Sequence, residues 1–162
     1  MKKVLTRTGL ALLGILVLIQ LWRPSRENPP VRPQDTIEAR TSMPPGIASI
    51  LHRACRDCHS HETAWPWYGN VAPVSWIVAH DVQEGREHLN LSTWAQYGNE
   101  DGALHLGEVC KEVRSGAMPM GRYVRVHPEA ALSEDDRRAI CEWTRDEGKR
   151  LLSSATPGTA AP

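Results

Sequence analysis

The chain has 162 residues, which is enough for one folded domain and short for two. Its 19 basic and 19 acidic residues balance to a formal charge of zero, so it lacks the basic excess of nucleic-acid-binding domains. Six tryptophans and no phenylalanine supply most of its large aromatic surface, which can fill a small core or lie against a flat cofactor.

Residues 1–22 are typical of an export signal. Three basic residues precede an apolar run over residues 9–22 that only Gln20 interrupts. The run is short for a membrane span of about 20 residues, and no cleavage site of small residues follows it. We expect an uncleaved anchor in the bacterial cytoplasmic membrane, with the rest of the chain on the periplasmic side. The alternative is a cleaved signal peptide, which would leave a soluble periplasmic protein.

A linker is expected over residues 23–44. This stretch contains prolines and charged residues without an apolar period, which is typical of an extended, semi-rigid spacer. It would hold the following domain, residues 45–152, away from the membrane. Met43 lies near the end of the linker, and we expect it to be too far from the core to bind a cofactor.

A helix that begins at Pro45 is predicted to lead into the sequence Cys55-Arg56-Asp57-Cys58-His59. Apolar residues recur along it at helical spacing, in the order Ile47, Ile50, Leu51, Ala54, Cys55 and Cys58. The motif is C-x-x-C-H, the attachment site of a c-type haem. Thiols one helical turn apart can each form a thioether to one vinyl group of the same porphyrin. The imidazole of His59 can then bind the iron as the proximal ligand.

Two other chemistries also use a C-x-x-C pair. A thioredoxin-type redox pair lies at a strand-to-helix turn in a βαβ pattern, and no such pattern surrounds Cys55. A structural zinc site needs further ligands, whereas Cys110 and Cys141 are single and far apart. Haem is therefore favoured, and a structural zinc or thiol-redox domain is the less favoured alternative.

A second helix is predicted from Val74 to about His88, after a loop over residues 61–73. Trp76 and His80 share one face of this helix, which makes His80 a candidate iron ligand, although a packing role suits it as well.

Three more side chains are candidates for the haem environment. Trp65 and Trp76 have the flat aromatic surface that suits a porphyrin. Arg86 is a candidate partner for a haem propionate, because the guanidinium fork matches a carboxylate.

The C-terminal half is predicted to contain two further helices. One carries an apolar face made of Leu106, Val109, Cys110 and Val113, and it ends at Ser115-Gly116. The last begins at Ser133, with Asp136 three residues on as a variant of the capping box, and turns Ile140 and Trp143 inward. Residues 153–162 are predicted to form a disordered tail.

Several stretches beyond the motif resemble a known family. They are Thr63-Ala64-Trp65-Pro66-Trp67-Tyr68, Ala72-Pro73-Val74-Ser75-Trp76, His80-Asp81-Val82, Gly85-Arg86, Leu89-Asn90-Leu91-Ser92, Trp94, Met118-Pro119 and His127-Pro128-Glu129-Ala130. Over about residues 47–147 the chain resembles the small bacterial haem-binding domain family, single-haem relatives of cytochrome c. The resemblance implies an all-α domain of about four helices around one covalent haem c. It also implies Met118 as the distal iron ligand, and Met120 is the rival in the same loop.

The motif uses two of the four cysteines and leaves Cys110 and Cys141. In an oxidising compartment these two are candidates for a disulfide between the third and last helices. The alternative is a pair of buried free thiols, which behave as small apolar side chains.

The expected function is one-electron transfer at the outer face of the cytoplasmic membrane, with redox proteins as partners and no nucleic acid. No catalytic arrangement of Ser, His and Asp or of paired carboxylates is defined by spacing, so an electron carrier is favoured over an enzyme. The alternative is a haem-based sensor or small peroxidase, in which the sixth iron position is open.

Overall fold

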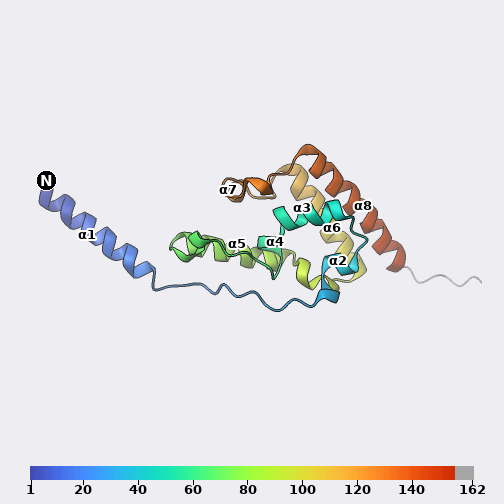
Figure 1. Cartoon of the computed structure of the whole chain (residues 1–162), viewed down its shortest axis with the longest axis horizontal. Coiled ribbons are helices and arrows are strands. Elements are labelled where there is room, and N and C mark those ends of the chain that lie inside the picture. The colour runs from blue at the N-terminus through green and yellow to red at the C-terminus, as the bar shows by residue number, and fades with distance from the viewer. Residues whose placement is uncertain (156–162) are drawn as a thin grey trace, which may run out of the picture.

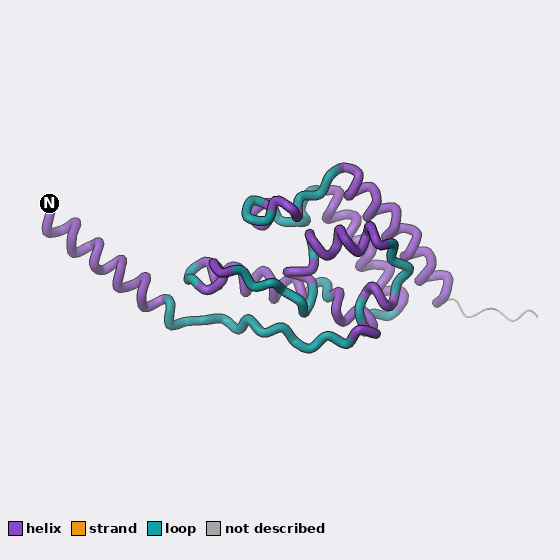
Figure 2. Tube along the Cα trace, in the orientation of Figure 1, coloured by secondary structure: helices purple, strands orange, loops and turns teal. Residues whose placement is uncertain are grey.

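The computed structural model describes residues 1–155, and every regular element among them is a helix (Figure 2). The α-helices are α1 (Lys2–Ile19), α2 (Ile37–Arg40), α3 (Pro45–Ala54), α4 (Arg56–His59), α5 (Val74–His88), α6 (Asn99–Ser115), α7 (Gly121–Val124) and α8 (Glu134–Ala155). Short 3-10 helices complete the set: η1 (Pro33–Asp35), η2 (Trp67–Asn70), η3 (Leu91–Gln96) and η4 (Pro128–Ala130). The predicted all-α fold is confirmed.

The core lies where α3 and η3 pack against the pair formed by α6 and α8, which run side by side (Figure 1). Its most buried apolar side chains are Ile37, Ile47, Leu51, Trp94, Leu106, Val113, Ala130 and Ile140. Full burial of one large apolar side chain contributes about 1.5–3 kcal/mol to folding, so this cluster dominates stability. A disulfide between Cys110 and Cys141, with sulfur atoms 2.01 Å apart, also joins α6 to α8.

Several helix boundaries match the sequence pattern. Helix α3 begins at Pro45, and α5 runs from Val74 to His88 as predicted. At the start of α8, the backbone N–H of Ser133 donates to Asp136 Oδ2 at 2.8 Å, and the N–H of Asp136 donates back to Ser133 Oγ at 3.1 Å. This is the predicted capping box, which satisfies helix-end donors in both directions.

The predicted linker, residues 23–44, is only partly a spacer. Its first part is extended (Figure 2), but η1 and α2 fold its second part onto the domain. Thr36 caps α2 by accepting from the backbone N–H of Ala39, and Ile37 is only 1% exposed. Met43 packs against the same core, so the expectation that it lies far from the core is wrong. A single apolar residue between polar ones has no period, which is why the sequence pattern missed α2.

The start predicted for the disordered tail, residue 153, is too early, because α8 extends to Ala155. Residues 153–155 belong to α8, because Leu151 is anchored in the core and the hydroxyls of Ser153 and Ser154 bond to carbonyls one turn back. The remainder of that prediction, residues 156–162, lies outside the described residues.

Helix α1 occupies the segment where a membrane anchor was expected. Among the helices of residues 1–155, none combines the length and the apolar character needed to cross a membrane. Helix α1 has 18 residues, and three of them, Lys2, Lys3 and Arg7, are basic. The spanning anchor predicted for residues 1–22 is therefore not found.

Candidate functional site

The C-x-x-C-H motif lies at a break between two helices. Cys55, with φ −124° and ψ −35°, ends α3 and precedes α4, so the thiols do not share one continuous helix as predicted. The backbone on both sides remains bonded. The N–H of Cys55 donates to Leu51 O at 2.9 Å, and Cys55 O accepts from the N–H of His59 at 2.9 Å. The motif therefore forms one helical turn of its own.

The imidazole of His59 is oriented by the backbone of α5. Its Nδ1 lies 2.8 Å from Gly85 O and 3.1 Å from Leu89 O. Carbonyl oxygens only accept, so Nδ1 carries the proton and Nε2 keeps its lone pair. Burial outweighs these bonds and lowers the pKa of His59, which keeps the ring neutral. A neutral imidazole with a fixed tautomer and a free Nε2 is a metal ligand held ready by its surroundings.

Helix α5 approaches α4 closely only because residue 85 is glycine. A Cβ at this position would lie 2.6 Å from Cys58 O, far inside van der Waals contact. Gly85 therefore brings its own carbonyl within reach of His59. From the sequence, Gly85 stood out only as part of a family resemblance, and this role was not predicted, although an isolated glycine inside a predicted helix can have a packing reason.

The motif thiols are unpaired, whereas the other two cysteines form the disulfide. Burial is the main cause that raises the pKa of Cys55 to about 12 and that of Cys58 to about 11. Both side chains are thus neutral thiols at neutral pH, unlike the thiolates of redox-active C-x-x-C pairs. Within residues 1–155 no three His, Cys, Asp or Glu side chains gather closely enough to hold a metal ion, so a zinc site lacks its donors.

A hydrogen bond and an ion pair join the segment between α6 and α8 to the motif and to α5. Tyr123 Oη donates to Asp57 Oδ2 at 2.8 Å, and Asp57 is an internal residue of the motif. Arg122 forms a bidentate ion pair with Asp81 of α5, with a shortest distance of 2.6 Å. Burial and the neighbouring Asp57 raise the pKa of Tyr123, which therefore keeps its proton.

A second set of side-chain contacts joins the same segment to η2. Tyr68 Oη and His127 Nε2 lie 2.8 Å apart, and the His127 ring stacks on Tyr123 with centroids 4.3 Å apart. None of these side chains was predicted from the sequence to be a site residue. Their pairing joins residues far apart in the chain, and no local pattern reports it.

The loop that contains the candidate distal ligands directly precedes the helix of Arg122 and Tyr123. The N–H of Met118 donates to Glu112 O at 3.1 Å, which ties this residue to the last turn of α6. Met120 directly precedes α7. Both side chains are partly buried, and neither belongs to the core. Tyr123 ties α7, which directly follows this loop, to the motif, but no contact distinguishes the two sulfurs, and Met118 remains a prediction.

Arg86 is engaged by the protein itself. Its guanidinium donates to Ser60 O, Glu27 O, Asn28 Oδ1 and Thr63 Oγ1 at 2.7–3.0 Å. Arg86 thereby joins the segment after α1 to the loop that follows the motif. A propionate would have to compete with these partners, which weakens the role predicted for Arg86.

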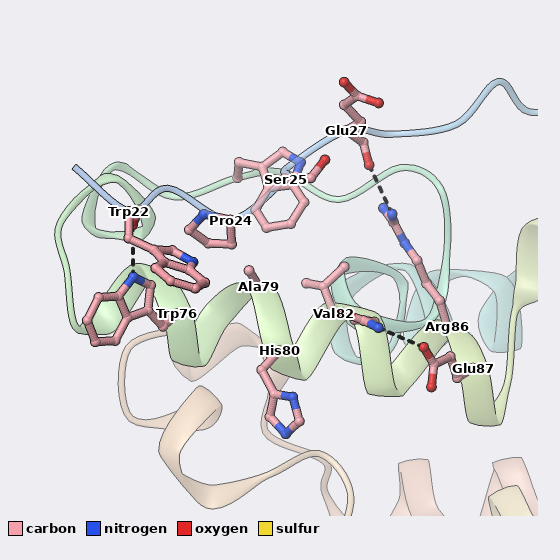
Figure 3. A pocket seen from close by; sticks show the side chains of 12 residues that line it. Trp22, Pro24, Ser25, Glu27, Trp76, Ala79, His80, Val82, Arg86 and Glu87 are labelled. Carbon is pink, nitrogen blue, oxygen red and sulfur yellow. Dashed lines mark hydrogen bonds between the residues drawn. The ribbon is translucent and has the colours of Figure 1, made fainter. Parts of the chain in front are cut away.

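The haem-environment role predicted for Trp65 and Trp76 stays a prediction. Together with Trp22 they line a pocket of about 530 Å³ between α5 and the segment after α1, and Cys55, Cys58 and His59 do not line it (Figure 3). His80 lies at the edge of this pocket, and its imidazole points away from Trp22 (Figure 3).

Comparison with known proteins gives one positive result. Residues 14–146 match a family model described as a haem-binding domain. Neither the search of curated proteins nor that of solved structures finds a match.

Proposed function

This chain belongs to the haem-binding domain family, and we propose that it holds one haem c through Cys55 and Cys58 and transfers single electrons. The observation that carries the proposal is the orientation of His59. Its Nδ1 is bonded to Gly85 O and Leu89 O, so Nε2 is the nitrogen available to iron.

The two thiols suit covalent attachment. They are neutral, partly buried and not joined to each other, in a chain whose other cysteines are oxidised to a disulfide. Each would form one thioether to the porphyrin, and His59 would then supply the proximal ligand from the same helical turn. These residues therefore fit the group that the family binds.

Met118 is the distal ligand in this proposal. When bound, the haem iron supplies a one-electron Fe(III)/Fe(II) couple. Ligation by one His and one Met raises the reduction potential of this couple. The chain supports both proposed ligands: Gly85 and Leu89 orient His59, and the bond between Tyr123 and Asp57 ties α7, which follows the loop of Met118, to the motif. A rigid site favours electron transfer, because little rearrangement accompanies the change of charge.

The proposed location is the outer face of the bacterial cytoplasmic membrane. Covalent haem attachment in bacteria takes place outside that membrane, and the basic, apolar start of the chain is typical of an export signal. The disulfide between Cys110 and Cys141 fits the same oxidising compartment. The electron donor and acceptor would be redox proteins in that compartment.

The test is covalent retention of haem. The full chain is expressed with a haem-maturation system and extracted with acidified acetone, which removes haem that is not covalently bound. We expect haem to stay with the protein, and to be lost from the variant in which Cys55 and Cys58 are both alanine. The matched control replaces Cys110 and Cys141 by alanine and should retain haem. Extraction of haem from the unaltered protein would contradict the proposal.

A further inference from the structure

Two uncharged stretches that are far apart in the sequence meet at one corner of the molecule. Residues 8–22 and residues 63–79 contain no Asp, Glu, Lys or Arg. The first stretch forms most of α1 and its end, and the second forms η2 and the first turns of α5. Figure 1 shows the end of α1 beside the tip formed by η2 and α5.

Hydrogen bonds hold the two stretches together. The side chain of Gln20 forms two hydrogen bonds with the backbone of Ala72. Its Oε1 accepts from the Ala72 N–H at 2.9 Å, and its Nε2 donates to Ala72 O at 3.1 Å. Trp76 Nε1 donates to Trp22 O at 2.9 Å (Figure 3). Arg26 then bonds to Gly69 O and to Asn70 Oδ1. The end of α1 is therefore fixed to this corner rather than tethered loosely.

The corner exposes large apolar side chains. We call the following set the corner patch: Leu21, Trp22, Trp67, Val71, Val74 and Ile77. Trp67 is 79% exposed and Trp22 is 76% exposed, although tryptophan is mostly buried in water-soluble proteins. Helix α1 next to the patch has no buried residue at all. Large apolar side chains that are exposed together at one corner of the fold indicate an interaction site.

We propose that the corner patch docks the domain onto the surface of a lipid bilayer, in continuation with α1. This rests on the proposed location at a membrane and adds the face of the domain that touches lipid. The continuity of the patch with the exposed apolar surface of α1 identifies lipid as the occupant. Tryptophans such as Trp22 and Trp67 are the side chains that favour the boundary between lipid and water. The stretch 63–79 itself adds no charged side chain that would have to be desolvated in that boundary.

Docking in this way orients the haem-binding motif. The patch lies at the first turns of α5, whereas Gly85 and the motif lie near its other end. At a rise of 1.5 Å per residue, about 16 Å of helix separates Val74 from Gly85. The motif would thus stay outside the lipid, and the domain would keep a constant orientation toward proteins that exchange electrons with it.

The experiment measures the reactivity of one introduced thiol in the haem-loaded full chain. Val71→Cys places the thiol in the patch, and Leu104→Cys is the matched control, because Leu104 is 68% exposed on α6 and lies outside the patch. With Cys55 and Cys58 bound to haem and the disulfide intact, the new thiol is the only free one. Its rate of reaction with a water-soluble maleimide is compared with and without vesicles of phosphatidylethanolamine and phosphatidylglycerol. Flotation shows how much protein is bound.

We expect the vesicles to slow the reaction of Val71→Cys by about tenfold, as for an apolar face buried in the headgroup boundary, and to leave Leu104→Cys unchanged. Ile77→Cys should behave like Val71→Cys. Protein that does not float, or that floats with an unprotected Val71→Cys, overturns the proposal. So does protection that depends on protein concentration without lipid, which would identify a second copy as the occupant. The haem spectrum of the same samples tests the proposed function separately.

Discussion

The α-carbon of Gly85 lies against the backbone of Cys58, so closely that a Cβ would come within 2.6 Å of Cys58 O. The carbonyl of the same glycine accepts a hydrogen bond from His59 Nδ1 at 2.8 Å. One residue thus sets both the spacing between α4 and α5 and the orientation of the proposed iron ligand. A larger residue there would disturb the two together.

Gly85→Ala should therefore damage both folding and haem binding. The new methyl group meets backbone atoms that cannot move aside, so we expect the free energy of unfolding to fall by about 1–3 kcal/mol, as in overpacked cores. The bond between His59 and residue 85 should lengthen, and covalent haem yield should drop. Urea denaturation and the haem absorbance per chain measure the two effects.

Gly107→Ala is the control for Gly85→Ala. Gly107 lies in α6, and nothing lies within 4 Å of a Cβ placed there. Alanine is the better helix former by about 0.8–1 kcal/mol, so this variant should be as stable as the unaltered protein or more so. Equal behaviour of the two variants would show that the contact between Gly85 and Cys58 is not a constraint.

Local patterns predicted much of the fold. The apolar stripe of α3, the limits of α5 and the capping box at Ser133 depend on residues a few positions apart, and each is found. The partners of His59 come from 26 and 30 residues away, and Tyr123 reaches Asp57 across 66 residues. Periodicity reports which face of a helix is buried but not which backbone atom it meets. The hydrogen-bond partners of the motif therefore could not be predicted from the sequence and are known only from the structure.

The disulfide between Cys110 and Cys141 gives a second prediction. The two cysteines are 31 residues apart, and the chain-entropy relation gives about 3.5–4 kcal/mol for a closed loop of that size. Replacing both by alanine should lower the free energy of unfolding by about that amount. Dithiothreitol should destabilise the unaltered protein similarly and leave the double variant unchanged. A further loss in the variant on reduction would mean that another disulfide contributes.

Asp136 should make stability depend on pH in the acid range. Burial alone would raise the pKa of Asp136, but hydrogen bonds from Ser133 and Arg53 outweigh it and lower the pKa. A lowered pKa contributes stability that is present above the ordinary carboxyl pKa, about 3.9, and is lost as the pH falls through the folded value.

Asp136→Asn should therefore lower the free energy of unfolding by about 1 kcal/mol at pH 7, as for a lost N-cap. The difference from the unaltered protein should shrink as the pH falls below the ordinary carboxyl range. Asp135→Asn is the control in the same turn, because its side chain is 82% exposed and its pair with Arg138 contributes little. Denaturation curves from pH 7 downward measure this, and a gap that stays constant with pH would contradict it.

The identity of the distal ligand is the last prediction, because it separates an electron carrier from a sensor with an open iron. The thioether of methionine is a soft ligand suited to haem iron. The backbone N–H of Met118 donates to Glu112 O, and the ring of Pro119 fixes the φ angle of residue 119. Ordering this segment costs less conformational entropy than ordering a free loop. Met120, two residues on, has the same chemistry and is the natural control.

We expect Met118→Ala to lose the methionine–iron charge-transfer band in the absorption spectrum, to lower the reduction potential and to let carbon monoxide bind the ferrous iron. Met120→Ala should keep the band, because the ligand remains in place. The opposite result would make Met120 the ligand. A band that survives each single change would mean that either methionine can bind the iron or that another methionine does. A six-coordinate iron without the band in the unaltered protein would instead direct attention to His80. An unaltered protein without the band that binds carbon monoxide would favour the sensor or peroxidase alternative over electron transfer.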